Sequence, residues 1–106
     1  MAEKASTHVG VATLSGVANG ELAGSATALQ MPNVPCNMAR LKARDDNAGN
    51  VYIGGAGVTL PDGTTDITTG YMLDAGDEIL LQVDNLNRLY RICDNAGDDL
   101  TYIALT

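Results

Sequence analysis

The chain has 106 residues, a formal net charge of −7 and 45% hydrophobic residues, which is enough for one domain with a modest core. Binding to nucleic-acid phosphates requires clustered cations, and since the chain holds only six Lys and Arg we expect no nucleic-acid partner. No apolar run approaches the roughly 18 residues of a membrane-spanning helix, and no signal-peptide pattern follows the first residues. We therefore expect a protein that is used as it is synthesised, without a membrane partner.

Residues 1–28 differ in composition from the rest of the chain. They are rich in Ala, Gly, Ser and Thr, and Gly10, Gly16, Gly20 and Gly24 interrupt any helix. Such a segment buries little apolar surface, so we expect an extended N-terminal arm that becomes ordered by lying on a neighbouring molecule or by adding an edge strand. A terminus without fixed structure and ordinary first strands of the domain are the alternatives.

The arm leads into residues 29–35, where Pro32 and Pro35 keep the chain extended and exclude a central strand. We expect the main partner-facing segment to be residues 1–35. Its candidate contact residues are His8, Val9, Val11, Leu14, Val17, Leu22, Leu29 and Met31.

The next stretch, residues 36–57, is the one around which we expect the chain to be organised. Small and apolar side chains alternate with long, mostly basic ones from Asn37 to Arg44, which is the period of two that is typical of a β-strand. A regular strand places Arg40, Lys42 and Arg44 on one face. That face is either solvated or a contact for an acidic protein surface, and we carry it as a second partner-binding candidate.

The turn that follows this strand has an echo near the C-terminus. Residues 45–50 are rich in Asp, Asn and Gly, and residues 51–53 resume as a strand, so the sequence predicts a β-hairpin over residues 36–57. Residues 91–103 repeat both the Asp-Asn-Ala-Gly turn and the Tyr-Ile pair. The repetition indicates either common turn chemistry alone or two similar hairpins that face each other in one sandwich.

Strand-like runs and turn signals alternate in the rest of the chain. The runs are 58–60, 71–73, 78–83, 89–93 and 100–105, and the segments between them include turns at 61–63 and 74–77 and a polar loop at 64–69. We expect the loop to be exposed, the most apolar run, 78–83, to be a central strand, and the last two runs to form a second hairpin. The predicted fold is all-β: a small antiparallel β-sandwich or jelly-roll-like barrel of residues 29–106, with residues 1–28 as its arm.

The sequence offers no arrangement of side chains for catalysis. His8 is the only histidine and lies in the arm, and no serine has the context of a nucleophile. The glycine-rich segment 54–57 lacks the Lys and the following helix of a phosphate-binding loop. We therefore expect no enzyme activity and no catalytic or cofactor-binding residues.

Acidic residues gather in the turns, where Asp bonds to nearby backbone groups. A calcium loop is the alternative, although neither Asp-rich turn has the full ligand pattern with a terminal Glu, and the single histidine argues against zinc. We expect Cys36 and Cys93 to be buried free thiols, with a disulfide as the alternative if their strands lie side by side.

One long segment is similar to a known group of proteins. Residues 28–55, ALQMPNVPCNMARLKARDDNAGNVYIGG, resemble a segment common in small virion proteins of tailed bacteriophages, which runs from a P-x-x-P-C-like start to an N-x-G-x-V-Y-[IV]-G-G return. Residues 71–79 resemble their G-x-x-L-x-P-G-E turn, with Ala75 where Pro is usual, and residues 85–90 resemble their closing strand. The resemblance covers roughly residues 29–105 and contains no catalytic motif.

The resemblance implies a non-enzymatic virion protein, and within that group we expect a capsid decoration (cement) protein on the outer surface of the major capsid protein shell. It implies synthesis in the host cytoplasm, the major capsid protein as partner and a homo-oligomer, which we expect to be a trimer from the symmetry of capsid positions. The alternative is a tail or fibre module that binds a host glycan. Such a module would expose a pair of the four tyrosine rings, Tyr52, Tyr71, Tyr90 and Tyr102.

Overall fold

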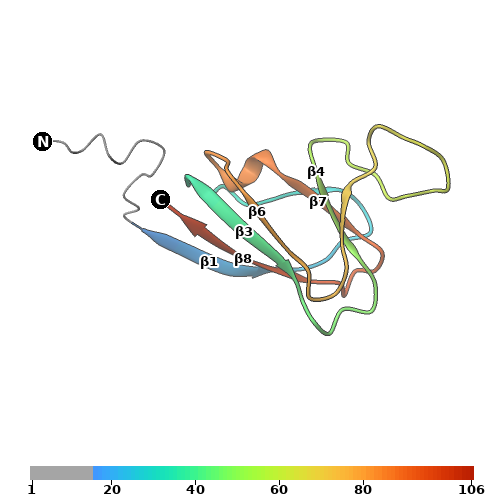
Figure 1. Ribbon diagram of the computed structural model, residues 1–106, viewed down its shortest axis with the longest axis horizontal. Helices are drawn as coiled ribbons and strands as arrows, with labels where there is room; N and C mark the ends of the chain where they lie inside the picture. Colours follow the sequence, from blue (N-terminus) through green and yellow to red (C-terminus); the bar gives the residue numbers. More distant parts are fainter. Residues whose placement is uncertain (1–15) are drawn as a thin grey trace, which may run out of the picture.

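The computed structural model describes residues 16–106 and places eight strands in two antiparallel sheets, which form the predicted all-β sandwich (Figure 1). In spatial order, sheet A contains β1 (Val17–Leu22), β8 (Leu100–Leu105), β3 (Met38–Ala43) and β6 (Glu78–Leu81). Sheet B contains β2 (Leu29–Gln30), β7 (Tyr90–Cys93), β4 (Val51–Gly54) and β5 (Tyr71–Leu73). A short 3₁₀ helix, η1 (Leu86–Arg88), lies between β6 and β7.

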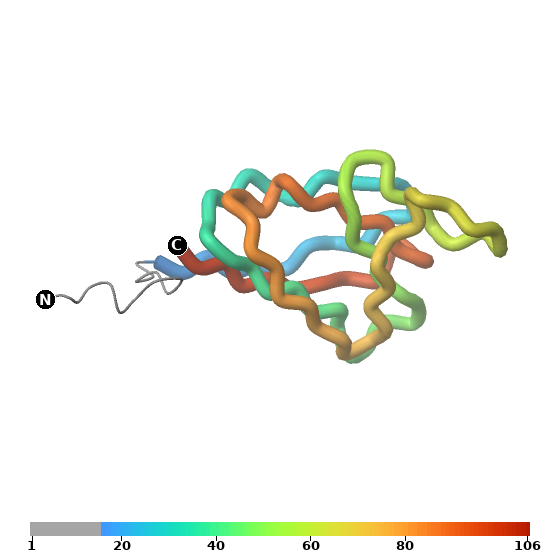
Figure 2. The backbone as a smooth tube through the Cα atoms, turned by 45° about the horizontal axis from the view of Figure 1, so that its top comes forward, coloured from blue at the N-terminus to red at the C-terminus, as the bar shows by residue number. Residues whose placement is uncertain are grey.

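The strand order is that of a jelly roll. The first strand pairs with the eighth, the second with the seventh, the third with the sixth and the fourth with the fifth. Two further pairs, β3 with β8 and β4 with β7, complete the sheets. Figure 2 shows the chain passing back and forth between the two layers, as two interlocked Greek keys require.

The main core lies between the sheets and consists of aliphatic side chains, Ala, Met and Cys. Sheet A contributes Ala39, Leu41 and Ala43 from β3, all essentially inaccessible, which confirms the period of two predicted for this strand. Val51 and Cys93 face them from sheet B at paired positions of the ladder.

The outer side of sheet B is also covered. Tyr52 and Ile92, which point away from the main core, pack with Val58 in a second cluster because the chain after β4 returns over this face. A Cβ atom on Gly70 would lie 2.7 Å from Tyr52 Cβ, so this approach requires glycine. Residues 61–69, including the predicted loop, lie exposed beyond this cover.

The two predicted hairpins are wrong in their pairing. β3 and β4 belong to opposite sheets, as do β7 and β8, so each Asp-Asn-Ala-Gly turn carries the chain across the sandwich. Turn residues determine where a chain reverses, but they do not determine whether the flanking strands hydrogen-bond to each other. The two repeated segments do lie side by side in one sandwich, because β3 pairs with β8 and β4 pairs with β7.

Two other elements differ from the expected order. The apolar run 78–83 was expected to be central, but its strand β6 pairs only with β3 among the described residues and is therefore an edge strand. β1 lies inside the segment assigned to the arm and pairs along its whole length with β8. It is thus an edge strand of the sandwich itself, as in the alternative of ordinary first strands. Residues 1–15 lie outside the described part of the chain.

Candidate partner-binding face

The side of sheet A that points away from the core carries side chains in regular rows. The strand register sets these rows, because residues that share a pair position project to the same side. Each row is given in the order from β1 across to β6. The first row contains Val17, Leu105 and Met38. The second contains Asn19, Ile103, Arg40 and Leu80, and the third contains Glu21, Thr101, Lys42 and Glu78. We call these eleven residues the outer face of sheet A.

One end of this face is mainly apolar, although Asn19 and Arg40 share the row of Ile103 and Leu80. Val17 is 65% exposed, Leu80 is 53% exposed and Ile103 is 42% exposed, while Met38 and Leu105 are half-buried. Solvated faces of antiparallel sheets normally carry polar side chains, so this end departs from the usual pattern. Gly16 lies at the same end, where its N–H donates to the carbonyl of Thr106 at 3.1 Å and its carbonyl accepts from Thr106 at 2.9 Å.

The other end of the face is charged. Arg40 and Lys42 lie on this face, and Arg44 follows directly after the end of β3. Each of the three forms an ion pair with a carboxylate of the same chain. Arg40 Nη1 lies 2.8 Å from Glu78 Oε1, and Lys42 Nζ lies 3.7 Å from Asp45 Oδ1. Arg44 binds Glu21 at 2.6 Å, and its Nε lies 3.2 Å from Asp46.

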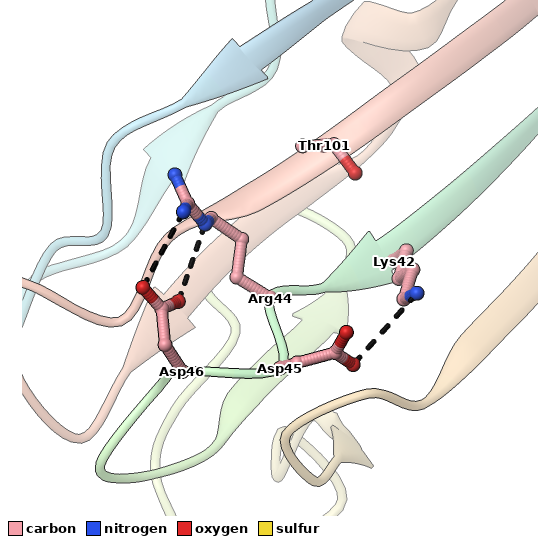
Figure 3. A pocket seen from close by; sticks show the side chains of 5 residues that line it. All are labelled: Lys42, Arg44, Asp45, Asp46 and Thr101. Carbon is pink, nitrogen blue, oxygen red and sulfur yellow. Dashed lines mark hydrogen bonds and ion pairs between the residues drawn. The ribbon is translucent and has the colours of Figure 1, made fainter.

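These charges surround an open depression of about 410 Å³ (Figure 3). Lys42, Arg44, Asp45, Asp46 and Thr101 line it. The hydrogen bond to Glu21 raises the pKa of Arg44, and the charges of Asp46 and Glu21 raise it further. The depression therefore holds paired charges of both signs, with no unpaired group that would act as a base or a nucleophile.

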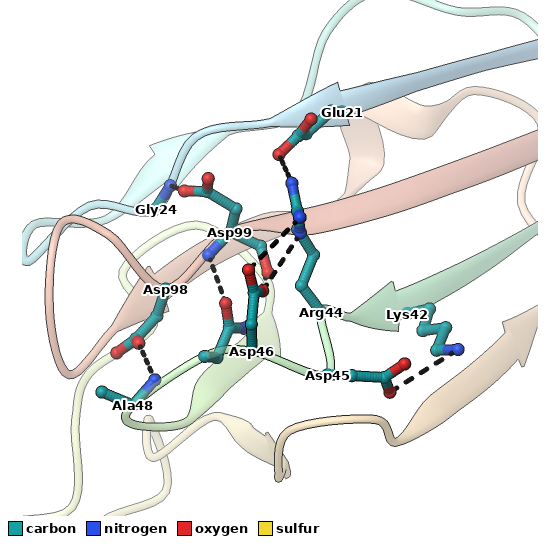
Figure 4. A network of polar contacts seen from close by, with 10 residues as sticks. Glu21, Gly24, Lys42, Arg44, Asp45, Asp46, Ala48, Asp98 and Asp99 are labelled. Carbon is teal, nitrogen blue, oxygen red and sulfur yellow. Dashed lines mark hydrogen bonds and ion pairs between the residues drawn. The ribbon is translucent and has the colours of Figure 1, made fainter.

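The turns below the charged end are joined into one polar network (Figure 4). Asp98 is 1% exposed, and its carboxylate accepts from Ala48 N at 3.1 Å, Gly49 N at 2.9 Å and Asn95 N at 2.9 Å. Burial alone would raise the pKa of Asp98, but hydrogen bonds from Gly49, Asn95 and Ala48 outweigh it and lower the pKa below its usual value. This network fixes the chain next to Arg44, whose N–H donates to the carbonyl of Asp99 at 3.1 Å.

The remaining predicted contact residues do not form one surface. Val17 and Leu29 are exposed, but Leu22 packs against the main core. Met31 is 2% exposed, so we withdraw it as a contact residue: the extended segment 29–35 turns its side chain into the core. The other four candidates, His8, Val9, Val11 and Leu14, lie outside the described residues.

Sequence reasoning missed the apolar end of the outer face. Its signal was present in residues 100–105, where Leu100 and Ala104 alternate with Ile103 and Leu105. Both sets are apolar, so the alternation could not show which set faces outward.

Residues 16–106 can be compared with the metal, glycan and disulfide alternatives. This part of the chain contains no group of three or more His, Cys, Asp or Glu residues that could hold a metal ion. It also contains no helix long and apolar enough to cross a membrane.

Of the four tyrosines only Tyr71 is exposed, at 63%, so no exposed pair of rings is present. Cys36 and Cys93 are both free and buried.

Comparisons with known proteins add no assignment. No protein-family model matches the chain, and no curated protein or solved structure shows significant similarity to it.

Proposed function

We propose that this protein is a non-enzymatic structural protein of a phage particle and that it acts as a capsid decoration protein on the outer surface of the shell. In this proposal the N-terminal segment contacts the major capsid protein, and the β-sandwich forms the body that covers the shell. The protein is made in the host cytoplasm and has its function in the virion.

The observation that supports this proposal most is the position of β1. It is an edge strand with no described strand on its free side, and Val17 at its start is exposed. Residues 1–15 precede this strand in the sequence. A free strand edge and a segment that leaves from it can bind a partner through backbone hydrogen bonds, which require no catalytic chemistry.

The ion pairs within the chain give the basic residues of β3 and its following turn a smaller role in partner binding than the sequence suggested. An acidic capsid surface would be recognised by unpaired cations, but Arg40, Lys42 and Arg44 are already paired within the chain. We therefore assign the contact with the shell to the N-terminal segment.

The direct test is to determine where the protein lies on particles released by cells that carry its gene. Antibodies against the purified protein should label the head exterior, and protein quantification should give copy numbers comparable with those of the major capsid protein. Labelling of the tail with few copies per particle would favour the tail or fibre module. Absence from particles would contradict both assignments.

A further inference from the structure

We propose that Arg91 anchors β1 to the body of the sandwich and thereby keeps the partner-binding strand edge preformed. Arg91 belongs to β7 in sheet B, and its guanidinium binds the chain on both sides of the crossing segment, residues 23–28, which leads from β1 in sheet A to β2 in sheet B. The anchor is a property of the free protein, whereas its effect on partner binding rests on the proposed function.

The position of Arg91 is unusual for a charged side chain. It is only 7% exposed, and no carboxylate within residues 16–106 pairs with it, whereas Arg40, Arg44 and Arg88 all form ion pairs. Burial lowers the pKa of Arg91, but an arginine side chain keeps its charge in proteins. A buried charge without an ionic partner destabilises a fold unless hydrogen bonds replace the lost water. Its hydrogen bonds therefore indicate its role.

The guanidinium of Arg91 joins two backbone carbonyls that belong to different sheets. Its Nε donates to the carbonyl of Ala23 at 3.0 Å, and its Nη1 donates to the carbonyl of Gln30 at 3.4 Å. Ala23 directly follows β1, and Gln30 lies in β2. An arginine holds several donors in a rigid fork, whereas a lysine has one compact ammonium group. The fork can thus fix both ends of the crossing segment at once.

Two contacts of the backbone support the same anchor. The N–H of Gly24 donates to Asp99 Oδ1 at 2.9 Å (Figure 4), and the N–H of Cys93 donates to the carbonyl of Ser25 at 2.7 Å. Like Arg91, both partners belong to residues 91–99, which form β7, the second Asp-Asn-Ala-Gly turn and the residues after it. The start of the crossing segment is therefore fastened to one part of the body.

β1 itself has a small share in the core. Its register with β8 places Ala18, Gly20 and Leu22 on the inner side, and of these only Leu22 has a large apolar side chain. β8 is the only strand that pairs with β1 among residues 16–106. Elements with few buried apolar contacts open locally at a lower free energy than the core. We therefore expect the anchor after β1 to have a large part in keeping this strand in place.

Hydrogen exchange of the full chain, followed by mass spectrometry, tests the anchor. Arg91→Met removes both donors and keeps a long apolar side chain at the buried position. The amides of residues 17–25 should then exchange about tenfold faster or more, while β3 and β4 keep their protection. Arg88→Met is the matched control, because Arg88 is exposed and pairs with Asp84, and it should change neither region.

A second variant separates the fork from the charge. Arg91→Lys keeps a cation but loses the fixed geometry, so exchange of residues 17–25 should still be faster than in the unmodified protein. Unchanged protection of residues 17–25 in both variants would overturn the inference. An equal loss of protection throughout the sandwich would also overturn it, because Arg91 would then stabilise the whole fold and not β1 in particular.

Binding to phage particles that lack this protein tests the part that rests on the proposed function. A preformed edge loses less conformational entropy on binding, so Arg91→Met should bind about tenfold more weakly than the unmodified protein and Arg88→Met should bind equally well. Equal binding of Arg91→Met would overturn the role of the anchor in partner binding. If the unmodified protein does not bind, the proposed function fails, and the exchange data still decide whether Arg91 anchors β1.

Discussion

Asn47 and Asp99 form two reciprocal hydrogen bonds that join the two turns at one end of the sandwich. The Asn47 side-chain N–H donates to the carbonyl of Asp99 at 2.8 Å, and the N–H of Asp99 donates back to Asn47 Oδ1 at 3.0 Å. Asp98 adds three bonds from backbone N–H groups on both turns. The repeated turn sequences therefore act together, because each satisfies backbone groups of the other that would otherwise be unpaired.

Loss of the Asp98 carboxylate should destabilise the fold. Asp98→Ala leaves the partly buried N–H groups of Ala48, Gly49 and Asn95 without their acceptor, and we expect the free energy of unfolding to fall by about 3 kcal/mol. Urea denaturation measures this change. Asp62→Ala is the control, since Asp62 lies in the exposed loop and bonds only to neighbours there; a loss of equal size in both variants would contradict the role of the network.

The carboxylate of Asp98 should also make the free energy of unfolding depend on pH in the acidic range. The pKa of Asp98 is lowered in the folded state, so its charge contributes stability above the unfolded-state pKa of about 3.9, and this contribution is lost as the pH falls through the lower folded-state pKa. The difference in unfolding free energy between the unmodified protein and Asp98→Ala should therefore be constant from pH 7 to about pH 5 and narrow below pH 4. If this difference in unfolding free energy grew as the pH fell, the predicted direction of the pH dependence would be wrong.

The two thiols should be protected in the native state. Burial raises the pKa of both Cys36 and Cys93, and the thiolate is the reactive form. We expect slow alkylation of the folded protein, with Cys36 modified before the fully inaccessible Cys93, and rapid alkylation of both in denaturant. Mass spectrometry after timed labelling measures the order, and fast modification of native Cys93 would contradict its position in the core.

The contact between the loop and sheet B should depend on glycine at one position. A Cβ atom on Gly70 would lie 2.7 Å from Tyr52 Cβ and 2.8 Å from Val58, so Gly70→Ala should cost about 2 kcal/mol through overpacking. Gly55→Ala in the same loop is the matched control. It meets nothing within 4 Å, and its effect on thermal unfolding should be close to zero.

Sequence reasoning was most successful where a local pattern has one physical cause. The alternation in Met38–Ala43 predicted a strand with one buried face, and the Asp-Asn-Ala-Gly repeats predicted two turns, because both signals depend on near neighbours. The pairing of the strands around these turns was wrong, since it depends on residues far apart in the chain. An apolar run such as Glu78–Leu81 is equally compatible with a central strand and with an edge strand that has Leu80 facing outward.

Sequence reasoning predicted only part of the candidate face. The period of two placed Arg40, Lys42 and Arg44 together, but their partners Glu21 and Glu78 come from β1 and β6, which only the folded topology brings beside β3. The apolar end combines side chains from all four strands of sheet A, so no single stretch of sequence contains it.

The most direct test of the central claim is an add-back experiment with phage particles that lack this protein. Purified full-length protein and a variant without residues 1–15 are each mixed with the particles, and bound copies are counted after sedimentation. Our account predicts saturable binding of the full-length protein at a level comparable with that of the major capsid protein, and loss of binding in the folded truncated variant. Failure of the full-length protein to bind, or equal binding of the truncated variant, would contradict it.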